Sequence, residues 1–181
     1  FDSGLGLDRG GALLDKLVML NIDPEEIDAV CITHCHGDHI GGMLTNGKAS
    51  FPNAEVYCAD KELKGFQGDK NTQDMLKVYG DRVHRFTAGD TLLGFIATID
   101  APGHTPGHTL YEIGPVLIVG DLLHAAALQI PHPEYCARYD MDQKKAVATR
   151  KQVYQYIEDH HKVVAGMHLP YSGVMEDFGK E

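Results

Sequence analysis

The sequence is poor in basic residues. Its 181 residues include 16 lysines and arginines against 26 aspartates and glutamates, which gives a formal net charge of −10. Proteins that bind phosphate backbones rely on clustered lysines and arginines, so a nucleic acid is not an expected partner. The sequence also lacks an apolar run of transmembrane length, so we expect no membrane partner. We interpret the excess of acidic residues as a solubilising surface.

The sequence contains only four cysteines, and no two of them form a Cys-x-x-Cys pair. Cys31 and Cys58 lie in apolar runs typical of strands, so we predict that both thiols are buried. A disulfide scaffold is not indicated in a chain of this length, which favours a reducing compartment and a cytoplasmic location. A secreted or periplasmic location stays an alternative, because the sequence begins without Met and a signal peptide would have been lost.

The most informative segment of the chain is rich in histidine and reads Thr33-His34-Cys35-His36-Gly37-Asp38-His39. Imidazole and carboxylate are the ligands that borderline divalent metals such as Zn²⁺ prefer. Ligands on one face of a helix recur every three or four residues, whereas spacings of two and one suit a loop that leaves a strand. We therefore predict a loop in which His34 and His36 face one metal site while Asp38 and His39 face another.

Two other interpretations of this segment are a histidine-rich surface loop and an engineered tag. The context disfavours both, because the motif is internal and residues 28–33 form an apolar, β-branched run typical of a buried strand. Gly41-Gly42, just after the motif, lets the backbone turn tightly behind the ligands. A metal site is the better explanation.

Three more candidate ligands lie beside turn residues at the ends of predicted strands. His104 follows Ala101-Pro102-Gly103, Asp121 follows the apolar run 116–120, and His168 follows the run 163–167. Functional sites are often built from loops at the ends of rigid strands. Each residue alone would be explained as well by a structural histidine or a helix-capping aspartate, but together they favour one shared site.

In this order, the motifs resemble the metallo-β-lactamase-fold hydrolase superfamily. The resemblance runs from Asp2 to about Gly173 and rests on Asp2-Ser3-Gly4, His34-x-His36-x-Asp38-His39, Pro102-Gly103-His104-Thr105-Pro106-Gly107, Gly120-Asp121 and His168. Within the superfamily, Gly120-Asp121-Leu122-Leu123-His124, Asp140-Met141-Asp142 with Ala148-Thr149-Arg150, and His168-Leu169-Pro170 resemble methyl parathion hydrolase-like and lactonase-like enzymes.

The resemblance implies an α/β fold of the metallo-β-lactamase type, an αββα four-layer sandwich. We expect one such domain over residues 1–181. The family pattern further implies that one or more N-terminal strands, and also a C-terminal extension, are missing from this sequence. An exposed sheet edge left by missing strands would favour association, so a homodimer is an expected assembly.

The resemblance also implies a role for each candidate ligand. His34, His36 and His104 would hold a first metal ion, and Asp38, His39 and His168 a second. Asp121 would bridge both ions together with a water or hydroxide, which makes Asp38 and Asp121 the candidate catalytic carboxylates. Four residues are expected near the site without binding metal, as supporting or substrate-contacting groups: Asp2, His108, His124 and His132.

Two metal ions that share a hydroxide lower its pKa toward neutrality and supply a nucleophile. No serine nucleophile is evident, since the sequence lacks Gly-x-Ser-x-Gly. The expected reaction is hydrolysis of a small-molecule ester, lactone, lactam, thioester or phosphotriester. Zn²⁺ is the default ion for a histidine-rich ligand set, with Mn²⁺ or Fe²⁺ as alternatives. Alternative functions are a mono-iron dioxygenase of the persulfide dioxygenase type and a metal-binding fragment that is catalytically incomplete.

Residue patterns place these candidates on elements of structure. Strands are expected at 28–33, 55–58, 83–86, 92–100, 110–113, 116–119 and 162–165. A helix is expected from about residue 13, Asp60 or Asn71 is expected to cap a helix, and Asp140 or Asp142 is expected to cap another that runs to about Asp159. The segment 60–80 either lies over the active site, as in the family, or is an ordinary surface helix.

Overall fold

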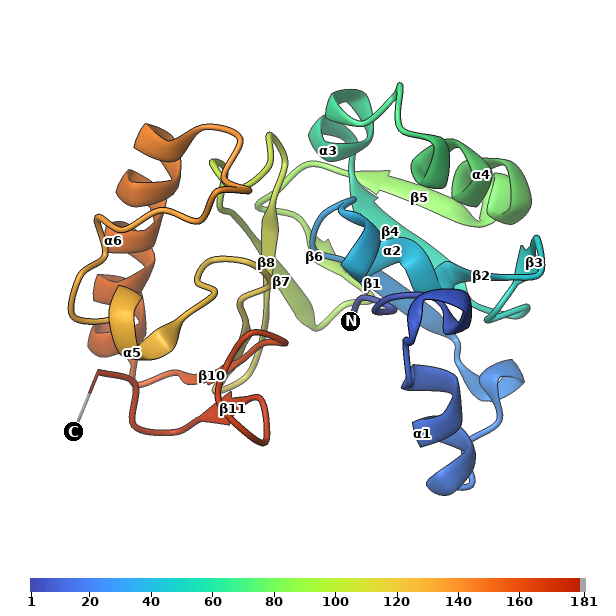
Figure 1. Cartoon of the computed structure of the whole chain (residues 1–181), viewed down its shortest axis with the longest axis horizontal. Coiled ribbons are helices and arrows are strands. Elements are labelled where there is room, and N and C mark those ends of the chain that lie inside the picture. The colour runs from blue at the N-terminus through green and yellow to red at the C-terminus, as the bar shows by residue number, and fades with distance from the viewer. Residues whose placement is uncertain (180–181) are drawn as a thin grey trace. The chain divides into compact units, whose positions relative to one another are not determined.

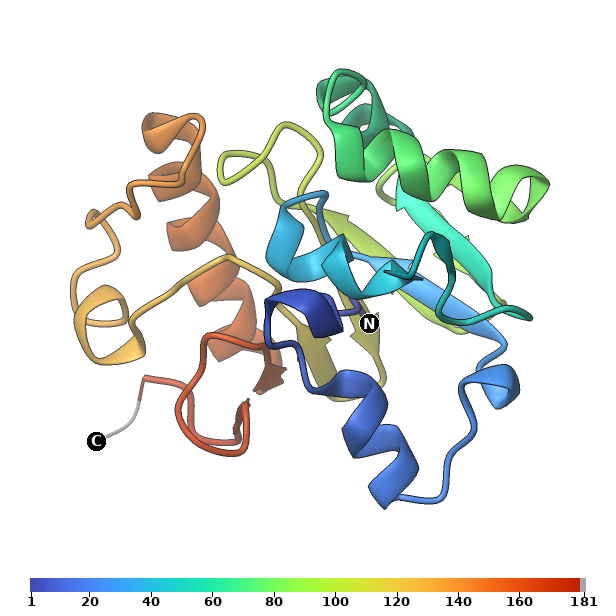
Figure 2. The same cartoon turned by 45° about the vertical axis from the view of Figure 1, so that its right-hand side comes forward.

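A parallel three-stranded sheet organises the first of two compact units, Phe1–Phe86, in the computed structural model, which describes residues 1–179. Strand β4 (Glu55–Ala59) lies at its centre and pairs with β1 (Ala29–Ile32) and β5 (Val83–Phe86). Helices α3 (Asp60–Gly65) and α4 (Lys70–Tyr79) lie on one face of this sheet (Figures 1 and 2). The other elements of this unit are η1 (Leu7–Arg9), α1 (Leu13–Met19), η2 (Pro24–Glu26), α2 (Gly37–Ile40), η3 (Gly41–Met43), β2 (Leu44–Thr45), β3 (Lys48–Ala49) and η4 (Gly80–Arg82).

The core of the first unit forms where these helices meet the sheet. Val30 and Ile32 of β1 and Val56 and Cys58 of β4 point to the same face, because side chains alternate along a strand. They pack in one cluster with Leu63, Met75 and Tyr79 from α3 and α4. The two thiols predicted to be buried, Cys31 and Cys58, are indeed buried. This rigid sheet fixes the end of β1, from which the histidine segment leaves.

A six-stranded sheet organises the second unit, Thr87–Glu181, with the order β11-β10-β9-β8-β7-β6. The long helix α6 runs along one face of this sheet, where Val153, Tyr154 and Ile157 pack in a cluster with Leu117 and Val164 (Figure 1). The elements of this unit are β6 (Thr91–Leu92), β7 (Ile96–Asp100), β8 (Thr109–Ile113), β9 (Val116–Ile118), α5 (Ala126–Gln129), α6 (Gln143–His160), β10 (Val163–Ala165) and β11 (Val174–Met175). The expectation of a single domain over residues 1–181 stays a prediction.

Two local predictions are wrong. The strand expected over 92–100 is interrupted, because Leu93 and Gly94 adopt positive φ angles of 52° and 79° and turn the chain between β6 and β7. Neither Asp60 nor Asn71 caps a helix; Asp69 does so for α4, where its side chain accepts a hydrogen bond from the Thr72 amide. For α6 the prediction is confirmed, because Asp142 accepts from the Lys145 amide at the first turn.

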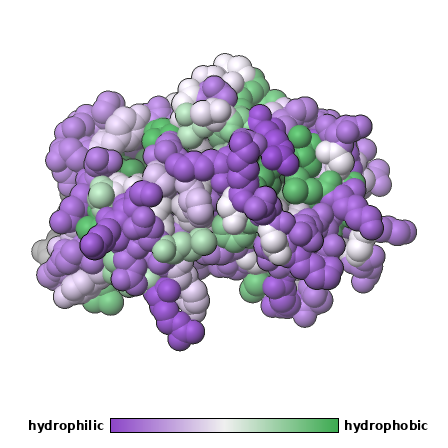
Figure 3. Space-filling model, turned by 90° about the horizontal axis from the view of Figure 1, so that it is seen from above, coloured by the Kyte–Doolittle hydropathy of each residue, from purple (hydrophilic) through white to green (hydrophobic). Residues whose placement is uncertain are grey.

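Hydrophilic residues dominate the face of the molecule drawn in Figure 3, and apolar residues form separate areas between them. Such a surface agrees with the interpretation of the many acidic residues as solubilising groups. Over residues 1–179, none of the helices is both long enough and apolar enough to cross a bilayer.

Candidate metal centre

The histidine segment begins directly after β1, and its backbone has two parts. His34 and His36 lie in the extended part, as predicted for a loop, whereas Asp38 and His39 lie on the short helix α2. The amides of His39 and Ile40 both donate to the His36 carbonyl oxygen, which closes this helical turn. The prediction of a loop throughout is therefore wrong for Asp38 and His39. The His34 ring lies 4.8 Å from the His36 ring and 3.9 Å from the His39 ring, measured between centroids, so this unit gathers three imidazoles.

Asp2 orients two of these histidines. Its carboxylate accepts hydrogen bonds from the Thr33 amide at 2.7 Å and the Thr33 hydroxyl at 2.8 Å, and Nδ1 of His39 lies 2.8 Å from it. Because a carboxylate only accepts, the His39 proton sits on Nδ1 and its Nε2 is left as a metal donor. The Thr33 hydroxyl, whose proton goes to Asp2, lies 3.0 Å from Nδ1 of His34 and leaves that histidine in the same tautomer. The geometry agrees with the supporting role expected for Asp2.

A close approach of two backbones keeps Asp2 in place. The Ser3 amide and hydroxyl both donate to the His39 carbonyl oxygen, and the Gly42 amide donates to Gly4. A Cβ atom on Gly42 would lie 2.2 Å from the Ser3 carbonyl oxygen, so no other residue fits there without a shift. The turn after the ligand motif therefore needs Gly42 for close packing.

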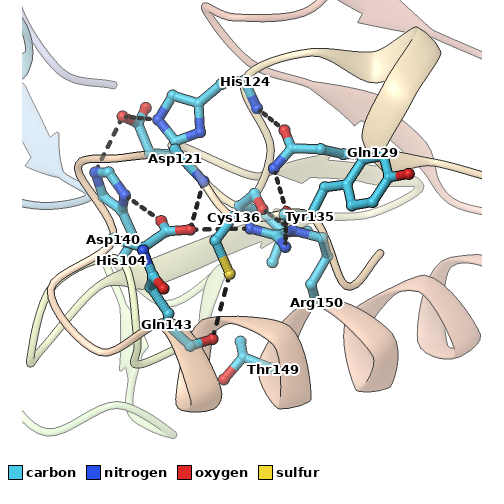
Figure 4. Close-up of polar contacts among 12 residues, drawn as sticks. His104, Asp121, His124, Gln129, Tyr135, Cys136, Asp140, Gln143, Thr149 and Arg150 are labelled. Atoms are coloured by element: carbon cyan, nitrogen blue, oxygen red, sulfur yellow. Dashed lines mark hydrogen bonds and ion pairs between the residues drawn. The ribbon is translucent and has the colours of Figure 1, made fainter. Parts of the chain in front are cut away.

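In the second unit, three imidazoles converge on the carboxylate of Asp121, which follows β9. Nε2 of His104 lies 3.1 Å from Oδ2 of Asp121, and Nε2 of His124 lies 3.0 Å from the same oxygen (Figure 4). Nε2 of His168 lies 3.4 Å from Oδ1. His104 and Asp121 are buried, whereas the His124 and His168 side chains are 18% and 32% exposed, so one side of this cluster is open to small molecules.

His108 supports Asp121 through the backbone. Its Nδ1 lies 3.1 Å from the Ala101 carbonyl oxygen, which only accepts, so Nδ1 carries the proton. Its Nε2 then accepts the hydrogen bond from the Asp121 amide at 3.1 Å. Both ring nitrogens are occupied in this way, which agrees with the expectation that His108 supports the site without binding metal.

The electrostatics of the second cluster favour a cation. Burial lowers the pKa of His104, but the carboxylates of Asp121 and Asp140, one at each ring nitrogen, outweigh it and raise that pKa above its usual range. The pKa of Asp140 is held below its usual range, because its bond to His104 and the nearby Arg150 outweigh the effect of burial. The carboxylates around His104 therefore favour a positive charge at this place, which a metal ion would also supply.

The donor set and its spacing fit a metal ion. Two donors on one tetrahedral Zn²⁺, each about 2.0–2.2 Å from the ion, are roughly 3.3–3.6 Å apart. The separations of His104 and His168 from Asp121, 3.1 and 3.4 Å, are close to this value. His104, His124 and Asp140 also each offer an atom within 4.8 Å of the other two. His124 thus lies closer to a ligand position than the sequence indicated.

Sequence reasoning named Asp140 as a possible helix cap and Arg150 as part of a family motif, but it gave neither of these buried residues a role at the site. Nδ1 of His104 lies 2.9 Å from Oδ1 of Asp140, and Arg150 lies behind Asp140 (Figure 4). The available signal was the position of Arg150 in a helix, next to residues that face the core. His132, by contrast, is exposed, with its ring 3.4 Å from Glu134 and stacked on Tyr135, and a substrate contact by His132 stays a prediction.

A cavity of about 590 Å³ lies in the first unit beside the ligand segment. Leu7–Arg9, Gly41 and Leu44–Gly47 form part of its wall, and Asn71 and Asp74 of α4 form the rest. Arg9 lies against the backbone of the ligand segment, since a Cβ on Gly37 would be 3.2 Å from its guanidinium. Residues of the segment 60–80 thus line a cavity next to the ligand segment, and their role over the active site stays a prediction.

Comparison with known proteins agrees with the motifs. The family model for the metallo-beta-lactamase superfamily matches residues 1–175. Hydroxyacylglutathione hydrolase of Serratia proteamaculans (strain 568) is 31% identical over 118 residues, which cover 63% of this chain and 39% of that protein. Protein YobT of Bacillus subtilis (strain 168), which is uncharacterized, is 30% identical over 104 residues, which cover 51% of this chain and 44% of YobT. The chain thus spans less than half the length of these curated relatives.

Two solved structures resemble nearly the whole chain. AbOPH, a hydrolase in the beta lactamase superfamily, superposes with a TM-score of 0.85 and 30% sequence identity. The match covers 96% of this chain and 68% of the AbOPH chain. AidC, a dizinc quorum-quenching lactonase, superposes with a TM-score of 0.86 and 27% identity over 96% of this chain and 69% of its own. The expected α/β fold of the metallo-β-lactamase type is confirmed. With the family model matched over residues 1–175, the chain belongs to the metallo-β-lactamase superfamily.

Proposed function

We propose that this protein is a dinuclear metal-dependent hydrolase of a small-molecule ester or lactone, with thioesters and phosphotriesters as further candidate substrates. The observation that carries the proposal is the approach of His104 and His168 to Asp121, at separations that suit shared coordination, with His124 beside them. The names of the relatives support hydrolysis, since they include a dizinc lactonase and hydroxyacylglutathione hydrolases.

In this proposal the ligands divide as the family resemblance implies. His34, His36 and His104 would hold one ion, Asp38, His39 and His168 would hold the other, and Asp121 would serve as a ligand to both. When bound, the two ions supply activation of a water molecule and polarisation of the bond that is broken. Zn²⁺ suits this histidine-rich set best.

The chain's own residues prepare the site for this chemistry. The Nδ1 protons of three histidines are held by hydrogen-bond acceptors: that of His39 by Asp2, that of His34 by Thr33, and that of His104 by Asp140. Each Nε2 can therefore face an ion without a change of tautomer. Asp38 in the first unit and His168 in the second are each only half-buried, so neither ligand cluster is sealed from a substrate. The Cys35 thiol, between His34 and His36 in the sequence, is not placed to attack a substrate, since it is buried and lies 3.9 Å from the Cys58 thiol.

A substrate panel with ligand variants tests the proposal. Lactones, aryl esters, thioesters and phosphotriesters are assayed with the zinc-loaded protein and with His34→Ala and Asp121→Ala. We expect hydrolysis of at least one class and a loss of at least about 100-fold in kcat/KM for each variant. His160→Ala, which removes an exposed histidine at the end of α6, is the matched control and keeps full activity.

Full activity in either ligand variant would refute the mechanism. A chain that turns over none of the four classes but consumes O₂ with iron bound would instead support a mono-iron dioxygenase. A chain that binds metal and turns over neither kind of substrate would support a binding fragment.

A further inference from the structure

One buried arginine connects two of the ligand-bearing segments of the second unit, those of His104 and Asp121. Arg150 lies on α6 and is 1% exposed. Its Nε donates to the Leu122 carbonyl oxygen at 2.8 Å, and its Nη1 donates at 2.8 Å to the carbonyl oxygens of Pro133 and Tyr135. Figure 4 shows Arg150 beside Tyr135 and Asp140. Its Nη2 lies 3.4 Å from Oδ2 of Asp140. A buried guanidinium is costly unless it is paired and hydrogen-bonded, and here four acceptors satisfy it.

Arg150 is connected to His104 through the carboxylate of Asp140. Oδ1 of Asp140 faces Nδ1 of His104, while Oδ2 accepts from the Ala137 amide and from Arg150. The carboxylate is thus held at both oxygens and fixes the plane of the imidazole. Two backbone hydrogen bonds join the loop of Asp140 to the loop of His104. The Met141 amide donates to the His104 carbonyl oxygen, and the Asp142 amide donates to the Gly103 carbonyl oxygen.

The second connection leads to Asp121. Leu122, whose carbonyl oxygen accepts from Arg150, is the residue directly after Asp121. Thr149, next to Arg150 on α6, donates to the Pro102 carbonyl oxygen at 2.6 Å, just before His104. One turn of α6 therefore contacts the segments that carry His104 and Asp121, whose Nε2 and Oδ2 atoms lie 3.1 Å apart.

We propose that Asp140 and Arg150 act as a buried positioning pair that sets the spacing between His104 and Asp121 and thereby the affinity of the site for its metal ions. The inference rests on the proposed function, because it concerns the ligands of the proposed dinuclear site. Neither residue is a catalytic residue in this proposal. Lysine cannot replace Arg150, since its single ammonium cannot reach acceptors spread around a planar guanidinium.

The test measures binding of Co²⁺ to the folded protein, by visible absorption and by competition with a chromogenic chelator. The variants are Asp140→Asn, Arg150→Lys and the double variant. We expect each single variant to lower the affinity for at least one of two Co²⁺ ions by about 10–100-fold and to change the absorption spectrum of bound Co²⁺. The loss of Co²⁺ affinity in the double variant should be smaller than the sum of the two single losses and close to the larger of them, because the pair acts as one unit.

Arg138→Lys is the matched control, since Arg138 is exposed and lies two residues before Asp140 in the same loop. It should bind Co²⁺ as the unaltered chain does. If Arg150→Lys fails to fold, Asp140→Asn carries the test, because it keeps the size of the side chain while it removes the charge and replaces one acceptor oxygen with an NH2 group.

A purely structural role predicts a different result. Variants that melt earlier yet bind Co²⁺ with unchanged affinity and spectrum would overturn the inference and leave the proposed function intact. An unaltered chain that binds no Co²⁺ would overturn both. An unaltered chain that binds two Co²⁺ ions, with weakened binding in the variants, supports both.

Discussion

Oδ2 of Asp2 lies 2.8 Å from Nδ1 of His39, across 37 residues of sequence. The same carboxylate receives the amide and hydroxyl of Thr33, and Thr33 in turn contacts His34. A residue at the start of the chain therefore controls the orientation of two histidines in the motif. Orientation of this kind decides how well a histidine binds metal.

Asp2→Ala should weaken Zn²⁺ binding by about 10–100-fold, because His39 and Thr33 lose their shared acceptor. It should also destabilise the metal-free protein by about 1–3 kcal/mol, since buried donors lose a partner. Chelator competition and denaturant unfolding in EDTA measure the two effects. Asp15→Ala, at an exposed position on α1, is the control and should change neither. Unchanged Zn²⁺ affinity in Asp2→Ala would show that Asp2 has no part in ligand orientation.

Gly103→Ala should destabilise the protein by on the order of 3 kcal/mol, from backbone strain and overpacking together. Gly103 has a φ of +138°, and an added Cβ would lie 2.2 Å from the backbone nitrogen of Ala146 on α6. His104 follows directly, so metal affinity should fall as well. Gly68→Ala is the matched control, because an added Cβ there meets nothing within 4 Å. Equal unfolding free energies for the two variants would contradict the close packing of this loop on α6.

Glu112 should make the stability of the protein sensitive to acid. Burial raises the pKa of Glu112, but the hydroxyl of Tyr156 and the ammonium of Lys162 outweigh this and hold that pKa below its usual range. A carboxyl whose pKa is lowered by folding stabilises the folded state above its unfolded pKa of about 4.3. That stabilisation is lost as the pH falls through the folded pKa.

Unfolding free energies of the metal-free chain and of Glu112→Gln, measured between pH 2 and 7, test this prediction. The unaltered chain should be more stable near neutrality, and the difference should shrink below about pH 4.3. Glu176→Gln, at an exposed position, provides the reference for loss of a surface charge. A difference that stays constant down to pH 2 would rule out the link between Glu112 ionisation and folding.

Many elements around the candidate site could be predicted, because residues close together in the sequence indicate them. The apolar run that became β1, the glycine turn after the motif and the Asp142 cap of α6 are all short-range signals. The family resemblance added the order of the ligands and the fold. The helical turn at Asp38 and His39 escaped prediction, because it depends on hydrogen bonds to the His36 carbonyl oxygen that residue spacing does not show.

Long-range partners were harder to predict. His104 and Asp140 are 36 residues apart, and Arg150 contacts Leu122 from 28 residues away. No periodicity pairs such residues, since their contact depends on how α6 packs on its sheet. The turn at Leu93 and Gly94 was missed for a related reason, because an apolar run gave no sign that Leu93 adopts a positive φ.

The number and identity of metal ions per chain test the central claim most directly. Elemental analysis is done on protein purified without chelator and without added metal. The account predicts two zinc or manganese ions per chain, held by the histidines and aspartates of the two clusters. One iron ion per chain would contradict the dinuclear hydrolase and favour oxygen chemistry, and a chain without bound metal would show that these residues do not form a metal centre.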